Sequence, residues 1–99
     1  MGVDLHNRTG KTFMANWWGW RRLLDNAFEY GWDPGRLASE HHYYHNDGQV
    51  VSAEDSTSIA DALESYVKSM KARGTEDPEW IAYTEEFIEF CRHGSFKIW

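Results

Sequence analysis

Residues 52–94 carry the start and stop signals of two helices that follow one another closely. Ser52 is a good N-cap, and apolar residues recur after it at three- and four-residue spacing until Gly74, which predicts a helix over residues 53–73. Asp77 caps the next segment, and Pro78 takes its first helical position, where a missing N–H costs nothing. This helix should end near Gly94. The residues expected to be buried are Ser56, Ile59, Ala60, Leu63, Val67 and Met70 in the first helix, and Trp80, Thr84, Phe87, Ile88 and Cys91 in the second.

The rest of the chain predicts short strands and one further helix. Residues 3–6 and 12–15 alternate apolar and polar side chains around turn residues, which is typical of a hairpin. Asn16 caps a helix expected over residues 17–30. Asp47-Gly48 predicts the turn of a second hairpin over residues 43–51, and residues 96–99 are expected to form a strand or extended tail. The expected buried face of the helix over 17–30 comprises Trp17, Trp20, Leu24, Ala27 and Phe28.

Together these elements predict an α+β fold, with three helices packed on a small antiparallel sheet of short hairpins. The hairpins and helices alternate too closely for the crossovers of a parallel sheet. With 99 residues, 41% of them hydrophobic and six of them tryptophan, the chain has enough apolar surface for a single compact domain over residues 1–99. Its one cysteine cannot form an internal disulfide, and it has no signal-peptide or membrane-spanning run, so we expect a cytoplasmic protein without membrane contact.

The net charge of −6 is unevenly distributed along the chain. Residues 1–39 carry a small positive excess, whereas residues 40–99 are strongly acidic. Direct binding to nucleic acid is therefore not expected, because such binding requires a basic surface that displaces counterions from phosphates. A protein partner with a basic patch is the more compatible kind of partner.

The acidic residues of the helix expected after Asp77 have two interpretations. They are either a solvated face whose first acids complement the helix dipole, or a docking surface for a basic patch on a partner. The candidate partner-binding acids are Glu79, Glu85, Glu86 and Glu89.

Trp18 is a further candidate for partner binding. It points about 100° away from Trp17 on the expected helix, so one helical face cannot hold both rings. Trp18 therefore either covers the edge of the core or is an exposed anchor of an interface. With Arg22 and Trp32 nearby in sequence, it could belong to a mixed aromatic and basic patch.

Three histidines lie close together at residues 41–45, and zinc uses such donors together with carboxylates. In an extended segment His41 and His42 point to opposite sides, so at most one of them joins His45. The spacing matches no specific zinc pattern, and the alternative is that these are ordinary hairpin histidines. The weak candidates for metal ligands are His42, His45 and Asp47.

No residue is nominated as catalytic, and no cofactor is expected. Cys91 would be the natural nucleophile, but it falls on a face that we expect to be buried, where a thiol is inert. Carboxylate pairs such as Glu85-Glu86 fall on faces expected to be solvated, without a cleft that would shift their pKa values.

Three blocks of the sequence resemble a group of small uncharacterised bacterial and phage-borne proteins. They are the blocks NDGQ-V at residues 46–50, N-W-x-G-W-R-x-L-L at residues 16–24 and F-C-R-x-G-x-F-x-I-W at residues 90–99. The resemblance covers most of the chain and implies a bacterial origin. It implies no established activity.

The sequence therefore predicts a small acidic bacterial protein that is not an enzyme and that binds another macromolecule, in toxin immunity or in conflict between phage and host. Two alternatives stay open. One is a small-molecule or metal-binding module that uses the hairpin at residues 41–47. The other is a domain with no separable site.

Overall fold

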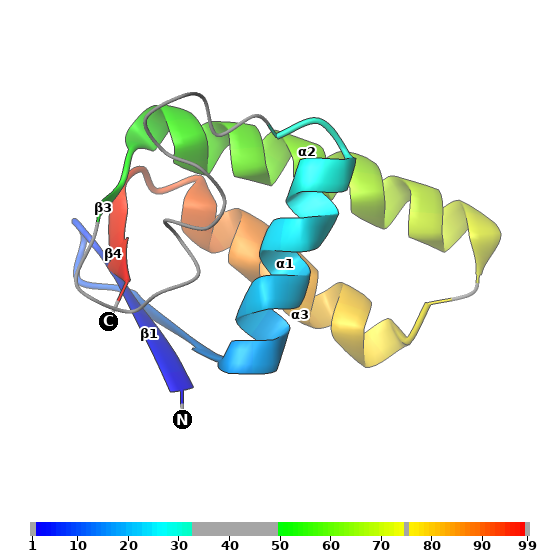
Figure 1. Cartoon of the computed structure of the whole chain (residues 1–99), viewed down its shortest axis with the longest axis horizontal. Helices are drawn as coiled ribbons and strands as arrows, with labels where there is room; N and C mark the ends of the chain where they lie inside the picture. Colours follow the sequence, from blue (N-terminus) through cyan, green and yellow to red (C-terminus); the bar gives the residue numbers. More distant parts are fainter. Residues whose placement is uncertain (1, 33–49, 75, 99) are drawn as a thin grey trace.

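The described part of the chain forms four short strands and three longer helices (Figure 1). The computed structural model describes residues 2–32, 50–74 and 76–98. In chain order, the elements are β1 (Gly2–Asn7), β2 (Thr12–Asn16), α1 (Trp17–Glu29), β3 (Val50–Val51), α2 (Ala53–Arg73), α3 (Pro78–Cys91) and β4 (Phe96–Ile98). The prediction of an α+β fold with three helices and an antiparallel sheet is confirmed.

The sheet has the strand order β2-β1-β4-β3, and every neighbouring pair is antiparallel. The hairpin predicted over residues 3–15 is formed by β1 and β2, with Leu5 opposite Phe13. The predicted terminal strand is confirmed as β4, in which Phe96 lies opposite Val51 of β3. Of the second predicted hairpin, only Val50 and Val51 are among the described residues. The last strand of the chain thus lies inside the sheet, between the first and third strands.

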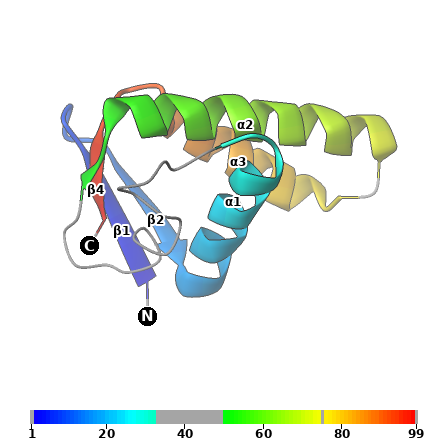
Figure 2. The same cartoon turned by 45° about the horizontal axis from the view of Figure 1, so that its top comes forward.

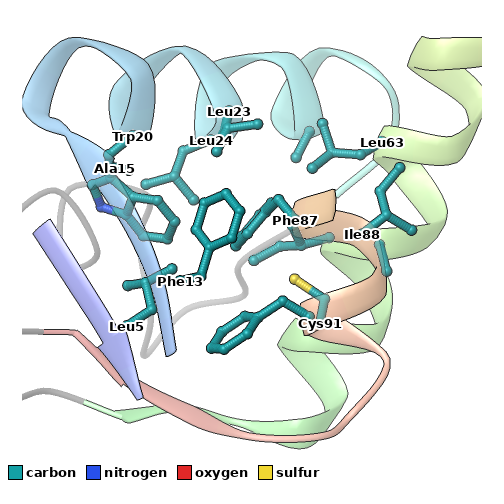
Figure 3. Close-up of a cluster of buried hydrophobic side chains, with 14 of the residues drawn as sticks. Leu5, Phe13, Ala15, Trp20, Leu23, Leu24, Leu63, Phe87, Ile88 and Cys91 are labelled. Carbon is teal, nitrogen blue, oxygen red and sulfur yellow. The ribbon is translucent and has the colours of Figure 1, made fainter. Parts of the chain in front are cut away.

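All three helices lie on one side of this sheet (Figure 2). Alternate strand residues, among them Val3, Leu5 and Phe13, are buried, because they point toward the helices. Figure 3 shows that Leu5 and Phe13 meet Trp20 of α1 and Phe87 of α3 in one core. The opposite side of each strand carries exposed side chains, as expected for a sheet that packs on one face only.

The helices begin where the sequence signals predict. The side-chain oxygen of Asn16 accepts a hydrogen bond from the N–H of Gly19 at 2.6 Å, and Ser52 Oγ accepts one from the N–H of Asp55 at 3.1 Å. α2 ends at Gly74, whose φ of 67° lies in the left-handed region. The predicted limits 53–73 are confirmed, and α1 ends one residue earlier than predicted.

The predicted buried face of α1 needs correction. Phe28 is 50% exposed, whereas Leu23, which was not predicted to be buried, is fully buried. The buried stripe follows Trp20, Leu24 and Ala27, and Phe28 lies about 100° around the helix from Ala27. In α2, Met70 is only partly buried. No described helix is both long and apolar enough to cross a membrane.

Candidate functional site

Trp18 is the most exposed large aromatic side chain of the described residues, with 71% of its surface accessible. Asn16 ends β2 and caps α1, so Trp18 lies in the first turn of the helix. It does not share the buried face of Trp20, which is fully buried two residues later. The Trp18 ring is therefore exposed, which an interface anchor requires.

A hollow of about 440 Å³ lies beside Trp18, between β2, the start of α1 and the start of α3. Three of its lining residues are aromatic and two carry carboxylates. We call this region the Trp18 surface; it is lined by Met14, Asn16, Trp18, Gly19, Arg22, Asp77, Glu79, Trp80 and Tyr83. Met14 is as exposed as Trp18, at 72%.

Tyr83 ties α3 to the edge of the sheet next to this hollow. Its hydroxyl donates a hydrogen bond to the backbone oxygen of Met14 at 3.1 Å, and its ring lies 5.1 Å from that of Phe13. Burial, together with the negative charge of Glu86, raises the pKa of Tyr83 to about 12. Tyr83 is therefore a neutral donor at physiological pH and holds the wall of the hollow in place.

Arg22 lines the hollow and links α1 to α3. Its guanidinium carbon lies 4.1 Å from the ring centre of Trp80 and 5.7 Å from that of Trp18. Its Nη2 forms an ion pair with Glu76 Oε1 at 2.9 Å. The cation is therefore held by an aromatic face and by a carboxylate at the same time.

Glu76 is in turn held by α2 and α3. Its second oxygen accepts a hydrogen bond from Tyr66 Oη at 2.9 Å, and Tyr66 Oη accepts one from Trp80 Nε1 at 3.0 Å. The hydrogen bonds from Tyr66 and from Arg22 lower the pKa of Glu76 below its ordinary value. We call Arg22, Glu76, Tyr66 and Trp80 the latch, since they join all three helices.

Two other carboxylates line the hollow without belonging to the latch. Asp77 caps α3 by accepting a hydrogen bond from the N–H of Glu79 at 3.0 Å. Among the described residues, Glu79 forms no ion pair through its carboxylate. Among the described residues, the hollow thus combines exposed aromatic surface with one cation, Arg22, and two carboxylates, Asp77 and Glu79.

A second hollow of about 410 Å³ is lined by Trp18, Arg21, Arg22, Asp25 and Asn26 of α1. Trp18 and Arg22 belong to both hollows. The exposed Trp18 side chain therefore borders two hollows.

The structure divides the acidic residues that the sequence nominated together. Glu79 lies beside Trp18, and the exposed Glu86 is close enough to Tyr83 to affect its pKa. Glu85 instead forms an ion pair with Lys71 of α2 at 3.2 Å, and with Glu89 it lines a separate hollow of about 310 Å³ between α2 and α3. The four acids therefore do not form one surface.

The mixed aromatic and basic patch that the sequence suggested around Trp18 contains other residues than expected. Trp32 does not belong to it, because only 2% of its surface is accessible. Met14 and Tyr83 take part although the sequence reasoning did not nominate them. The outward position of Met14 in an alternating hairpin strand was the available signal for an exposed apolar side chain.

The remaining nominated groups are the candidate metal ligands and Cys91. The candidate metal ligands His42, His45 and Asp47 lie outside the described residues. Within the described parts of the chain, no three His, Cys, Asp or Glu side chains are grouped so that they could hold a metal ion. Cys91 is fully buried, and burial raises the pKa of its thiol to about 12.

Comparisons with protein-family models, with curated proteins and with solved structures find no match to this chain.

Proposed function

We propose that this protein is a non-enzymatic binding protein that uses the Trp18 surface to recognise a basic patch on another protein. The observation that carries the proposal is the exposure of Trp18, which borders two hollows. Tryptophan, methionine and arginine are enriched at protein interfaces, and tryptophan often supplies much of the binding energy there. Trp18, Met14 and Arg22 supply this combination on one surface.

The preference for a basic partner follows from the charge of this surface. Arg22 is paired with Glu76, so Asp77 and Glu79 leave an excess of negative charge at the rim of the hollow. The whole chain also carries a net charge of −6, which would speed the approach of a basic protein. Neutralisation of a toxin or of a phage protein is the biological setting that suits a small acidic binder of this kind.

The experiment that tests this proposal is affinity purification from a bacterial host lysate with the tagged wild-type protein and with the variant Trp18→Ala. We expect the wild type to retain one stoichiometric protein partner. Loss of a central tryptophan should weaken binding by about 2 kcal/mol or more, roughly 30-fold, so the variant should lose the partner on washing. Because Trp18 is mostly exposed, its truncation should change the free energy of unfolding by less than about 0.5 kcal/mol.

Phe28→Ala is the matched control, since Phe28 is also an exposed aromatic residue of α1 but does not line either hollow. This variant should retain the partner. Retention of the partner by Trp18→Ala, or absence of any stoichiometric partner with the wild type, would contradict the proposal.

A further inference from the structure

The Trp18 surface already holds one guanidinium group, which belongs to its own chain. Arg22 lies with its guanidinium carbon 4.1 Å from the ring centre of Trp80 and pairs with the carboxylate of Glu76 at 2.9 Å. An aromatic face and a carboxylate are the two elements that a guanidinium group needs for stacking and for paired hydrogen bonds. In this first set, Arg22 occupies both the aromatic face of Trp80 and the carboxylate of Glu76.

A second set of the same elements lies in the same hollow and is open to solvent. Trp18 supplies the aromatic ring, and Asp77 and Glu79 supply the carboxylates. Most of the Trp18 side chain is accessible. The guanidinium carbon of Arg22 also lies over the Trp18 ring, at 5.7 Å from its centre, but it is closer to Trp80, so Arg22 does not take the close stacking position on Trp18.

We propose that this second set receives an arginine side chain from the partner, which stacks on Trp18 and pairs with Glu79 and Asp77. The inference rests on the proposed function, since it names the group by which the basic patch would be recognised. Arginine is preferred over lysine because its planar guanidinium stacks on an indole and offers several donors to carboxylates, whereas an ammonium group is a compact and strongly hydrated charge. The hollow of about 440 Å³ is large enough for a side chain of this size.

The competing possibility is that Trp18 inserts into an apolar pocket of the partner and that no cation is involved. The two possibilities differ in their dependence on charge. An arginine that pairs with Glu79 should bind more weakly as salt concentration rises, and the carboxylate should be necessary. If Trp18 instead inserts into an apolar pocket, the affinity should depend little on the salt concentration or on the carboxylate of Glu79.

The experiment is an NMR titration of the purified ¹⁵N-labelled protein with three short peptides that are identical except for arginine, lysine or the neutral analogue citrulline at two positions. The indole signal of Trp18 is assigned by its loss in Trp18→Ala. We expect the arginine peptide to shift this signal and the backbone signal of Glu79. The lysine peptide should bind at least about threefold more weakly, because its compact, strongly hydrated ammonium group lacks a planar face that stacks on the indole. The citrulline peptide should bind at least tenfold more weakly than the arginine peptide.

Two pairs of variants identify the residues responsible. Trp18→Ala and Glu79→Gln should each weaken binding of the arginine peptide at least fivefold. Phe28→Ala and Glu89→Gln are the matched controls, because they make the same kind of change on the same two helices outside this hollow. They should leave the affinity unchanged.

Equal binding of the arginine and citrulline peptides, or unchanged affinity in Glu79→Gln, would overturn the inference. Absence of any shift at Trp18 with the arginine peptide would overturn it as well, even where affinity purification recovers a partner that depends on Trp18. Conversely, recognition of the arginine peptide at Trp18 without a recoverable partner would count against the proposed function and support the arginine site. The two experiments therefore fail independently.

Discussion

Burial determines the chemistry of single residues in this protein, and Cys91 is the clearest case. Its side chain is fully buried in the core, among the residues drawn in Figure 3. A thiolate would be poorly solvated there, so the pKa of the thiol rises from 9.0 to about 12. The thiol therefore stays protonated in the folded state at pH values where it ionises in the unfolded chain.

This shift predicts a loss of stability at alkaline pH. Between pH 9 and about 12 the unfolded state releases the Cys91 proton and the folded state retains it, so the free energy of unfolding should fall as pH rises. One such group contributes a slope of up to about 1.4 kcal/mol per pH unit. Urea denaturation at a series of pH values measures this slope.

Cys91→Ala provides the comparison. The variant should be less stable at neutral pH because it loses buried atoms, but its stability should fall less steeply above pH 9. Part of the slope should remain, because the pKa of Tyr83 is also raised to about 12. A slope equal to that of the wild type would show that Cys91 does not titrate as described.

The latch determines how the helices are joined. Arg22 comes from α1, Tyr66 from α2 and Trp80 from α3, and Glu76 lies just before α3 and bonds to both Arg22 and Tyr66. These hydrogen bonds favour the ionised form of Glu76 and lower its pKa. The stabilisation that they provide is therefore present above the ordinary pKa of 4.5 and is lost as pH falls through the lowered pKa.

Replacing Glu76 by glutamine should lower the free energy of unfolding at pH 7 by about 1 kcal/mol, which is typical of a partly exposed, hydrogen-bonded ion pair. The variant should also lose less stability than the wild type when the pH is lowered below 4.5. Thermal denaturation followed by circular dichroism at pH 7 and pH 3 measures both effects. Glu89→Gln, with an exposed side chain, is the control and should match the wild type at pH 7. If the variant Glu76→Gln is as stable as the wild type at pH 7, the charge of Glu76 in the latch contributes nothing to stability.

The position of β4 determines how the whole molecule is assembled. β4 pairs with β1 on one side and with β3 on the other, so it connects the first strands to the segment that leads into α2. Phe96 of this strand is 2% exposed, and its ring lies 5.2 Å from that of Phe90 and 6.1 Å from that of Phe87. The sheet and α3 therefore meet at Phe96.

Truncation of Phe96 to alanine should destabilise the protein by about 3–5 kcal/mol, the usual loss for a buried phenylalanine. This is a large part of the stability of a domain of ordinary size, about 5–15 kcal/mol. Urea denaturation monitored by tryptophan fluorescence measures the change. Lys97→Ala alters the next residue, which is exposed, and should change stability by less than about 0.5 kcal/mol. A similar small effect of Phe96→Ala would mean that β4 is not part of the core.

The limits of the helices and of the first hairpin could be predicted because they depend on local signals. An N-cap such as Ser52, a left-handed glycine such as Gly74 and alternating strand residues act over a few positions of the chain. The candidate site could be predicted only in part. Trp18 and Glu79 were nominated separately, and nothing in the sequence indicated that they share a hollow with Met14 and Tyr83.

The sequence by itself therefore determined where the described helices and the first hairpin lie, most of the residues on their apolar faces, and where the acidic residues concentrate. Only the tertiary structure decided that β4 lies inside the sheet, that Glu85 and Glu89 face the lysines of α2, and that Glu79 lies beside Trp18. The physical reason is that secondary structure follows from neighbouring residues, whereas these arrangements depend on how the helices pack across one face of the sheet. Trp18 is a potential binding residue because that packing buries Trp20 and leaves Trp18 at the surface.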